Sequence, residues 1–114
     1  MKLIYLQTAQ HGAGWFRSYY RQNPQLNLAK AVAALRAAET TLRDQPMAGE
    51  RMEGRIDVRE YKILGTAFSL LYTFANDTIW IIDIRDQRGF RSAEALRYFN
   101  QELRQCLKIE KPLR

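Results

Sequence analysis

The feature that most constrains the fold is a change in hydrophobic period near residue 45. Over residues 25–44 the chain is rich in alanine, and its apolar side chains recur at the spacing of one helix face. That stripe consists of Leu28, Ala31, Leu35, Ala38 and Leu42. Residues 45–49 contain Pro46 and Gly49, which is typical of a loop, and beyond them apolar and polar residues alternate with a period of two. Helices and strands in separate blocks predict an α+β fold.

Three consecutive strands with short turns are expected in the region of period two. Gly65 and Thr66 turn the chain after the first strand. Asn76 and Asp77 suit a two-residue hairpin turn, because both residues tolerate positive φ. The last of the three runs is β-branched and aromatic, which is typical of a strand buried on both faces. The expected strands are residues 55–63, 68–74 and 78–84. Such short turns predict an antiparallel three-stranded meander.

The N-terminal part of the chain predicts one strand and a helical hairpin. Residues 3–7 form a short, β-prone run that predicts a strand. The glycine-containing segment 11–14 is expected to be a loop that ends this strand. Four aromatic residues then follow at helical spacing, namely Trp15, Phe16, Tyr19 and Tyr20. Asn23-Pro24 is expected to end this helix and to start the next, since proline fits a first helical turn. Two helices joined by so short a segment form a hairpin.

A final helix completes the expected fold. Ser92 is a suitable N-cap with Glu94 in the first turn, and residues 110–114 are expected to be a frayed tail. The order is therefore β-α-α-β-β-β-α over a single domain, residues 1–114. We expect two layers, with the helical hairpin packed on the meander. The opposite face of the sheet would be partly open, and such a face is a natural binding surface.

Size and composition exclude several classes of protein. A chain of 114 residues and 13.4 kDa suffices for one domain with a hydrophobic core. Its single cysteine, Cys106, cannot form an internal disulfide, and its single histidine, His11, cannot form a His-pair metal site. We therefore expect no metal and no cofactor. No apolar stretch approaches the roughly twenty residues of a membrane span, so we expect no membrane partner and a cytoplasmic location.

Charge points to an acidic partner. The net charge is +6, and 13 of the 18 basic residues are arginine, whose guanidinium suits carboxylates and phosphates. Residues 1–56 and 87–114 each carry a net +4, whereas residues 57–86 carry −2. The partner could be nucleic acid or an acidic protein segment. A solvated arginine-rich helix face explains the same composition equally well.

Four segments resemble, in order, the motifs of one protein family. The motifs are "L…P..G" at residues 42–49, "vRe..i" at 58–63, "TpF.liY" at 66–72 and "i.il.i.DqR" at 79–88. The family is the RelE/ParE superfamily, the toxins of bacterial type II toxin–antitoxin modules, which include plasmid stabilisation systems. The similarity covers about residues 15–91. It implies the same α+β architecture, and it implies a cognate antitoxin whose flexible segment wraps the toxin in a toxin–antitoxin hetero-oligomer.

Two branches of this family differ in activity. Toxins of the RelE branch cut mRNA on the ribosome without metal, which requires an acid, a base and cations for the developing phosphate charge. Toxins of the ParE branch bind DNA gyrase. RelE-type proteins usually carry an arginine in a "yRlvY" strand, and Ser69 stands at that position here. The sequence therefore favours a ParE-like inhibitor of gyrase that is not an enzyme. The alternatives are a ribosome-dependent mRNA endoribonuclease using Arg85, Arg88 and Tyr98, and a non-toxic basic nucleic-acid-binding module.

Five arginines are candidates for binding the target or the partner. They are Arg59, Arg85, Arg88, Arg91 and Arg97. Each also has a structural interpretation. Arg59 could form a cross-strand ion pair with Asp83, and Arg88 could form a salt bridge at the end of its strand. The basic stripe of Arg91, Arg97 and Arg104 could be a solvated helix face. Tyr98 lies among the apolar residues of the last helix, which favours packing over chemistry.

Overall fold

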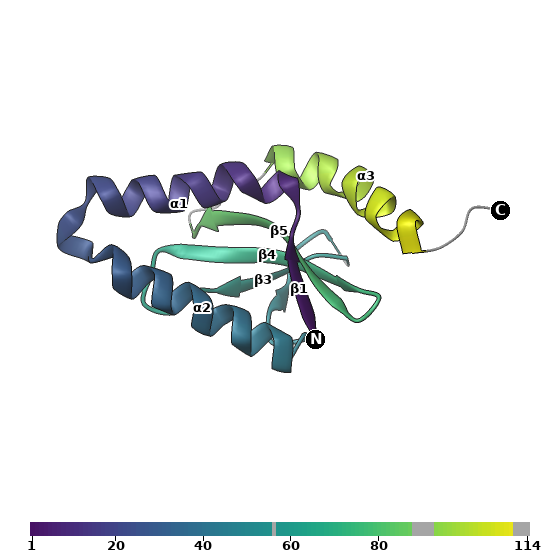
Figure 1. The fold of residues 1–114 in the computed structure, drawn as a ribbon, viewed down its shortest axis with the longest axis horizontal. Coiled ribbons are helices and arrows are strands. Elements are labelled where there is room, and N and C mark those ends of the chain that lie inside the picture. Colours follow the sequence, from purple (N-terminus) through teal and green to yellow (C-terminus); the bar gives the residue numbers. More distant parts are fainter. Residues whose placement is uncertain (56, 88–92, 111–114) are drawn as a thin grey trace.

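The computed structural model describes residues 1–55, 57–87 and 93–110, the last three without their side chains. It shows an α+β fold with the predicted order of elements (Figure 1). The helices are α1 (Gln10–Gln22), α2 (Leu28–Asp44) and α3 (Ala93–Glu110), with two short 3-10 helices, η1 (Gln7–Ala9) and η2 (Pro24–Leu26). The strands are β1 (Lys2–Tyr5), β2 (Glu50–Arg51), β3 (Arg59–Lys62), β4 (Phe68–Ala75) and β5 (Thr78–Asp86).

The five strands form one sheet in the order β1-β5-β4-β3-β2. Strands β3, β4 and β5 make the predicted antiparallel meander, and β1 pairs with β5 in parallel. The turn between β4 and β5 is the predicted one, since Asn76 and Asp77 have φ values of 52° and 54°. The helical hairpin between β1 and β2 is the connection that allows β1 to lie parallel to β5 at the far side of the meander.

The hairpin of α1 and α2 covers one face of the sheet, which we call the first face (Figure 1). Leu35, Ala38 and Leu42 of α2 are buried, as their spacing predicts. The aromatic residues of α1 contribute edge-on ring contacts, such as that between Phe16 and Phe68 with centroids 5.1 Å apart. The strand side chains in this core are Phe68, Leu70, Tyr72, Ile79, Ile81 and Ile84.

Three local expectations are wrong. Residues 11–14 are not a loop, because α1 begins at Gln10 and runs through both glycines. Glycine in a helix costs about 1 kcal/mol relative to alanine, and tertiary packing overrides that preference here. The strand expected over residues 55–63 is limited to Arg59–Lys62. Glu50 and Arg51, expected to lie outside any strand, form β2 at the edge of the sheet.

Helix α3 packs on the opposite face of the sheet, which we call the second face. Its buried residues Ala95, Phe99 and Leu103 contact a smaller hydrophobic cluster. The other buried members of that cluster are Leu6, Val58, Leu71, Trp80 and Ile82. Figure 1 shows α3 starting beside the N-terminal end of α1 and running toward the end of the molecule opposite the α1–α2 turn. The second face is thus only partly covered by α3.

A β-bulge in β5 sets which side chains reach the second face. Leu71 pairs with Asp83 and Tyr72 pairs with Ile81, so Ile82 is an extra residue in β5. A bulge of this kind directs two successive side chains to one side of a sheet. Ile82 enters the cluster beneath α3, and Asp83 lines a cavity beside the same helix. Within the described part of the chain, no helix has the length and apolar character needed to cross a membrane.

Candidate functional site

The polar residues of the sheet gather at one end of the second face. Glu60, Leu71 and Asp83 lie in register across β3, β4 and β5, and Leu71 belongs to the cluster under α3. Ser69 and Arg85 are also in register, two residues further along their strands. Because side chains alternate along a strand, these residues share the second face. The predicted site residue Arg85 therefore lies next to Ser69, the position at which RelE-type proteins usually carry an arginine.

An ion pair within the sheet holds the side chain of Arg85. Its Nη2 donates to Oε1 of Glu60 at 3.0 Å, and the two side chains are only 13% and 22% exposed. Arg85 Nε and Ser69 Oγ are buried without a hydrogen-bond partner among the described residues. A buried polar atom without a partner costs roughly 1–3 kcal/mol. This end of the second face therefore combines one satisfied ion pair with two unsatisfied polar atoms.

Arg59 braces a loop and does not pair with Asp83. Its Nη1 donates to the carbonyl oxygen of Gly49 at 2.6 Å, in contrast to the ion pair considered from the sequence. The same loop is fixed by the buried Tyr72 hydroxyl, which donates to Pro46 O at 2.6 Å and accepts from Gly49 N at 2.9 Å. Burial raises the pKa of the Tyr72 phenol, and the Gly49 amide partly offsets that rise. The interaction made by Arg59 is thus structural.

Gly49 is required by this close packing. A Cβ atom at position 49 would lie 2.7 Å from the Tyr72 ring and 2.8 Å from the Glu60 carbonyl oxygen. Contacts that short are not tolerated, so a side chain here would push the loop away from the sheet. The glycine of the "L…P..G" pattern is therefore explained by its tight fit against β3 and β4.

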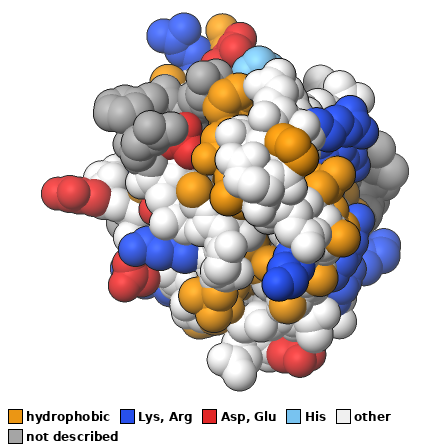
Figure 2. Space-filling model, turned by 90° about the vertical axis from the view of Figure 1, so that its left-hand side faces the viewer, with side chains coloured by type: hydrophobic (Ala, Val, Ile, Leu, Met, Phe, Trp, Pro, Cys, Tyr) orange, Lys and Arg blue, Asp and Glu red, His pale blue; other side chains and the backbone are white. Residues whose placement is uncertain are grey.

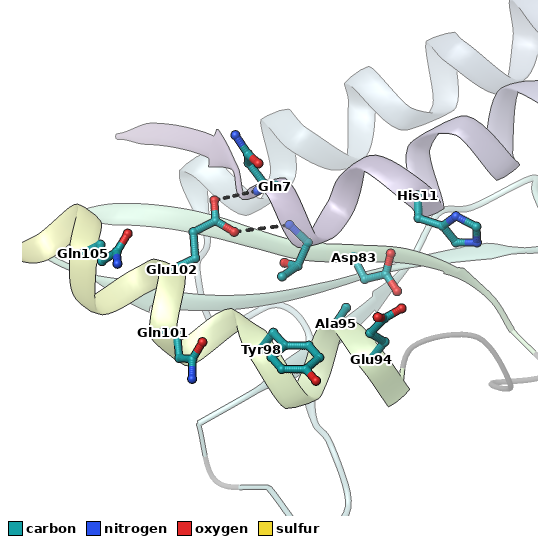
Figure 3. A pocket seen from close by; sticks show the side chains of 10 residues that line it. Gln7, His11, Asp83, Glu94, Ala95, Tyr98, Gln101, Glu102 and Gln105 are labelled. Carbon is teal, nitrogen blue, oxygen red and sulfur yellow. Dashed lines mark hydrogen bonds between the residues drawn. The ribbon is translucent and has the colours of Figure 1, made fainter.

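A cavity of about 720 Å³ lies between α3 and the start of α1 (Figure 3). Asp83 from β5 and Glu94 from α3 point toward one another there, with His11 of α1 nearby. The lining residues are Gln7, Thr8, His11, Asp83, Glu94, Ala95, Tyr98, Gln101, Glu102 and Gln105. Among the described residues, no lysine or arginine lines this cavity. The cavity is therefore acidic, although the chain as a whole is basic.

Two contacts hold the walls of this cavity together. The Glu102 carboxylate accepts from the backbone N–H of Gln7 at 2.6 Å and of Thr8 at 3.3 Å, which caps η1 from α3. On the opposite wall Gly12 lets α1 approach β5, since a Cβ there would lie 2.2 Å from Asp83 Oδ1. Glycine at position 12 is therefore a packing requirement and does not mark a break between β1 and α1.

Sequence reasoning missed this cavity. His11 was expected in a loop but lies in the first turn of α1, and Tyr98 was expected to pack but is 44% exposed. Both side chains line the cavity. The spacing of α3 carried a usable signal, because Glu94, Tyr98, Gln101 and Gln105 recur at intervals of three or four residues. No pattern in the sequence indicated that α1 and α3 lie close to each other.

The remaining predicted residues are either exposed on the surface or outside the residues that the structure describes. Arg97 and Arg104 are exposed on α3, which agrees with the predicted stripe. Arg88 and Arg91 lie outside the described residues. Among the described residues, no group of three or more histidine, cysteine, aspartate or glutamate side chains could hold a metal ion. The sequence matches no known family model, and no curated protein is similar to it.

Proposed function

We propose that this chain is the toxin of a type II toxin–antitoxin module and inhibits growth by binding DNA gyrase. Its cognate antitoxin would neutralise it in a hetero-oligomer, and both would act in the cytoplasm. The proposal starts from the resemblance of four segments to the RelE/ParE superfamily. The observed fold supports it, because β1, the helical hairpin, the meander of β3, β4 and β5, and α3 follow in the order that this resemblance implies, with the short edge strand β2 added.

One observation favours binding over RNA cleavage. Cleavage of a phosphodiester requires cations that can reach the developing charge on the phosphate. On the described sheet Arg85 is engaged by Glu60, and Arg59 is engaged by Gly49. Ser69, at the position of the family arginine, carries no charge and is fully buried. Among the described residues of β3, β4 and β5, no guanidinium is therefore free for a phosphate, and this favours a protein-binding inhibitor.

Expression of the chain without an antitoxin tests the proposal. We expect growth arrest in bacteria, and we expect the purified chain to inhibit supercoiling by gyrase in a reconstituted assay. Growth arrest with fully active gyrase would exclude gyrase as the target. Primer extension on mRNA from the arrested cells then tests the ribonuclease alternative, in which Arg85, Arg88 and Tyr98 would produce cuts in phase with ribosomes.

A pair of variants tests the predicted site. With Arg88→Ala, growth arrest should require at least a tenfold higher inducer concentration, because the family motif places a target contact at this residue. Arg51→Ala is the matched control, because Arg51 is exposed at the edge of the sheet and its substitution removes the same charge. Both variants should keep the circular dichroism spectrum of the parent. Equal growth arrest by Arg88→Ala and the parent would remove Arg88 from the site.

A further inference from the structure

Four exposed arginines lie along the helical hairpin. Arg17 and Arg21 are one turn apart on α1, and Arg36 and Arg43 are two turns apart on α2. Residues four or seven apart share one side of a helix, so each pair presents its guanidiniums in one direction. We call these four residues the hairpin arginines.

One arginine of each pair lies at a groove between the two helices. Arg17 and Arg36 both line a cavity of about 310 Å³ between α1 and α2. Arg36 and Arg43 both lie close enough to Tyr5 for their positive charges to act on its phenol. Arg17 and Arg36 therefore join the two pairs at this cavity, with Arg21 one turn further along α1 and Arg43 two turns further along α2. Figure 2 views the molecule from the end with the α1–α2 turn, and it shows Lys and Arg side chains gathered along one flank.

Little negative charge opposes this surface. The acids of the hairpin are Glu39 and Asp44, and Glu39 is only 4% exposed. Its carboxylate accepts from the Tyr5 hydroxyl and from Arg36 Nη1, yet the Arg36 side chain stays 63% exposed. Among the described residues, the other three hairpin arginines form no ion pair. The surface thus keeps most of its positive charge for an external partner.

We propose that the hairpin arginines bind the phosphodiester backbone of a duplex nucleic acid. The guanidinium is planar and donates two parallel hydrogen bonds to a phosphate, so arginine is favoured over lysine at such contacts. Four of them along two helices can contact several phosphates at once, which releases condensed counterions. This binding is a property of the chain alone, and it does not rest on gyrase being the target.

Fluorescence anisotropy of the full chain with a 20-base-pair duplex tests the proposal. Four phosphate contacts predict a slope of log affinity against log salt of about −3.6, or roughly a 100-fold loss between 50 and 200 mM salt. The measurement is made in parallel with DNA and RNA duplexes of the same sequence. Binding to only one of them identifies the nucleic acid whose backbone is recognised. Absence of binding to both duplexes at 50 mM salt would overturn the proposal.

Two variants of equal charge locate the surface. Arg17→Gln with Arg21→Gln should reduce the magnitude of the salt slope by about 2. Arg51→Gln with Lys62→Gln removes the same charge from the exposed edge of the sheet and should leave the slope within about 0.5 of the parent value. Equal effects of the two double variants would contradict a localised surface. Tighter binding of poly-glutamate than of duplex would overturn the proposal in favour of an acidic protein partner.

Discussion

Alternate residues of β4 face two different environments. Phe68, Leu70 and Tyr72 join the core beneath α1 and α2, where the neighbouring side chains are hydrophobic. Ser69 and Leu71 face the other side of the sheet, where a small hydrophobic cluster borders a polar end. The first face consists of large side chains packed against two helices. The second face holds an ion pair, unsatisfied polar atoms and a cavity.

This difference predicts unequal contributions of the two faces to stability. A close-packed hydrophobic core stabilises a domain of this size and offers a partner nothing to bind. Polar groups that are buried without full compensation lower stability, and functional sites are where proteins commonly keep them. The two faces of a single sheet should therefore contribute differently to stability, and variants of neighbouring residues of β4 can measure the difference.

The largest expected effect comes from the first face. Leu70→Ala removes a fully buried side chain from the core beneath the hairpin. It should lower the free energy of unfolding by about 3 kcal/mol, because it loses transfer free energy and leaves a cavity. Urea denaturation followed by circular dichroism measures this loss. A cost below about 1 kcal/mol would show that the first face is loosely packed.

A smaller loss is expected where the first face meets the 46–49 loop. Tyr72→Phe deletes the hydroxyl that donates to Pro46 O and accepts from Gly49 N. The variant should lose about 2 kcal/mol, since a buried amide and a carbonyl are left unpaired. Hydrogen exchange at the Gly49 amide should accelerate as well. Unchanged exchange would mean that the loop is held by Arg59 alone.

Alkaline pH should weaken the contact between β1 and α2. Burial raises the pKa of Tyr5 far above its usual value of 10, with further increases from its hydrogen bond to Glu39 and from the Glu39 charge. An unfolded tyrosine ionises near pH 10, so the stabilisation is complete below that pH and is lost as pH rises above it. The loss should be about 1.4 kcal/mol per pH unit for this residue.

Comparison with Tyr5→Phe isolates this effect. The variant lacks the phenol, so its unfolding free energy should fall less steeply between pH 10 and pH 11 than that of the parent. Urea denaturation at both pH values provides the two slopes. Parallel slopes would contradict the role of Tyr5.

The smallest effect, and one of opposite sign, is expected on the second face. Ser69→Ala removes a buried hydroxyl that has no partner among the described residues. The unfolding free energy should stay the same or rise by up to about 1 kcal/mol, because an uncompensated polar group is lost. Thermal denaturation of the variant beside Leu70→Ala compares adjacent residues directly. A clear loss of stability would show that Ser69 has an interaction within the fold.

Much of the fold was predictable from the sequence, and the candidate site was predictable only in part. The period of two in β4 and the Asn76-Asp77 turn placed the meander correctly. Arg85 lies within β5, one residue beyond the strand expected from the sequence. Its pairing with Glu60 was not predicted, because that ion pair joins β3 to β5 across β4. The cavity was missed because η1 and the start of α1, which form one wall, are distant in the chain from β5 and α3, which form the other.

Local patterns of polarity and turn residues were sufficient to specify the helices, the meander and their order, because these depend on neighbours along the chain. Packing between distant elements decided the rest. Gly12 lies in a helix because α1 must approach β5, and the bulge at Ile82 directs Asp83 toward α3. Gly12 and Asp83 are 71 positions apart, and no periodicity within one segment encodes such a contact.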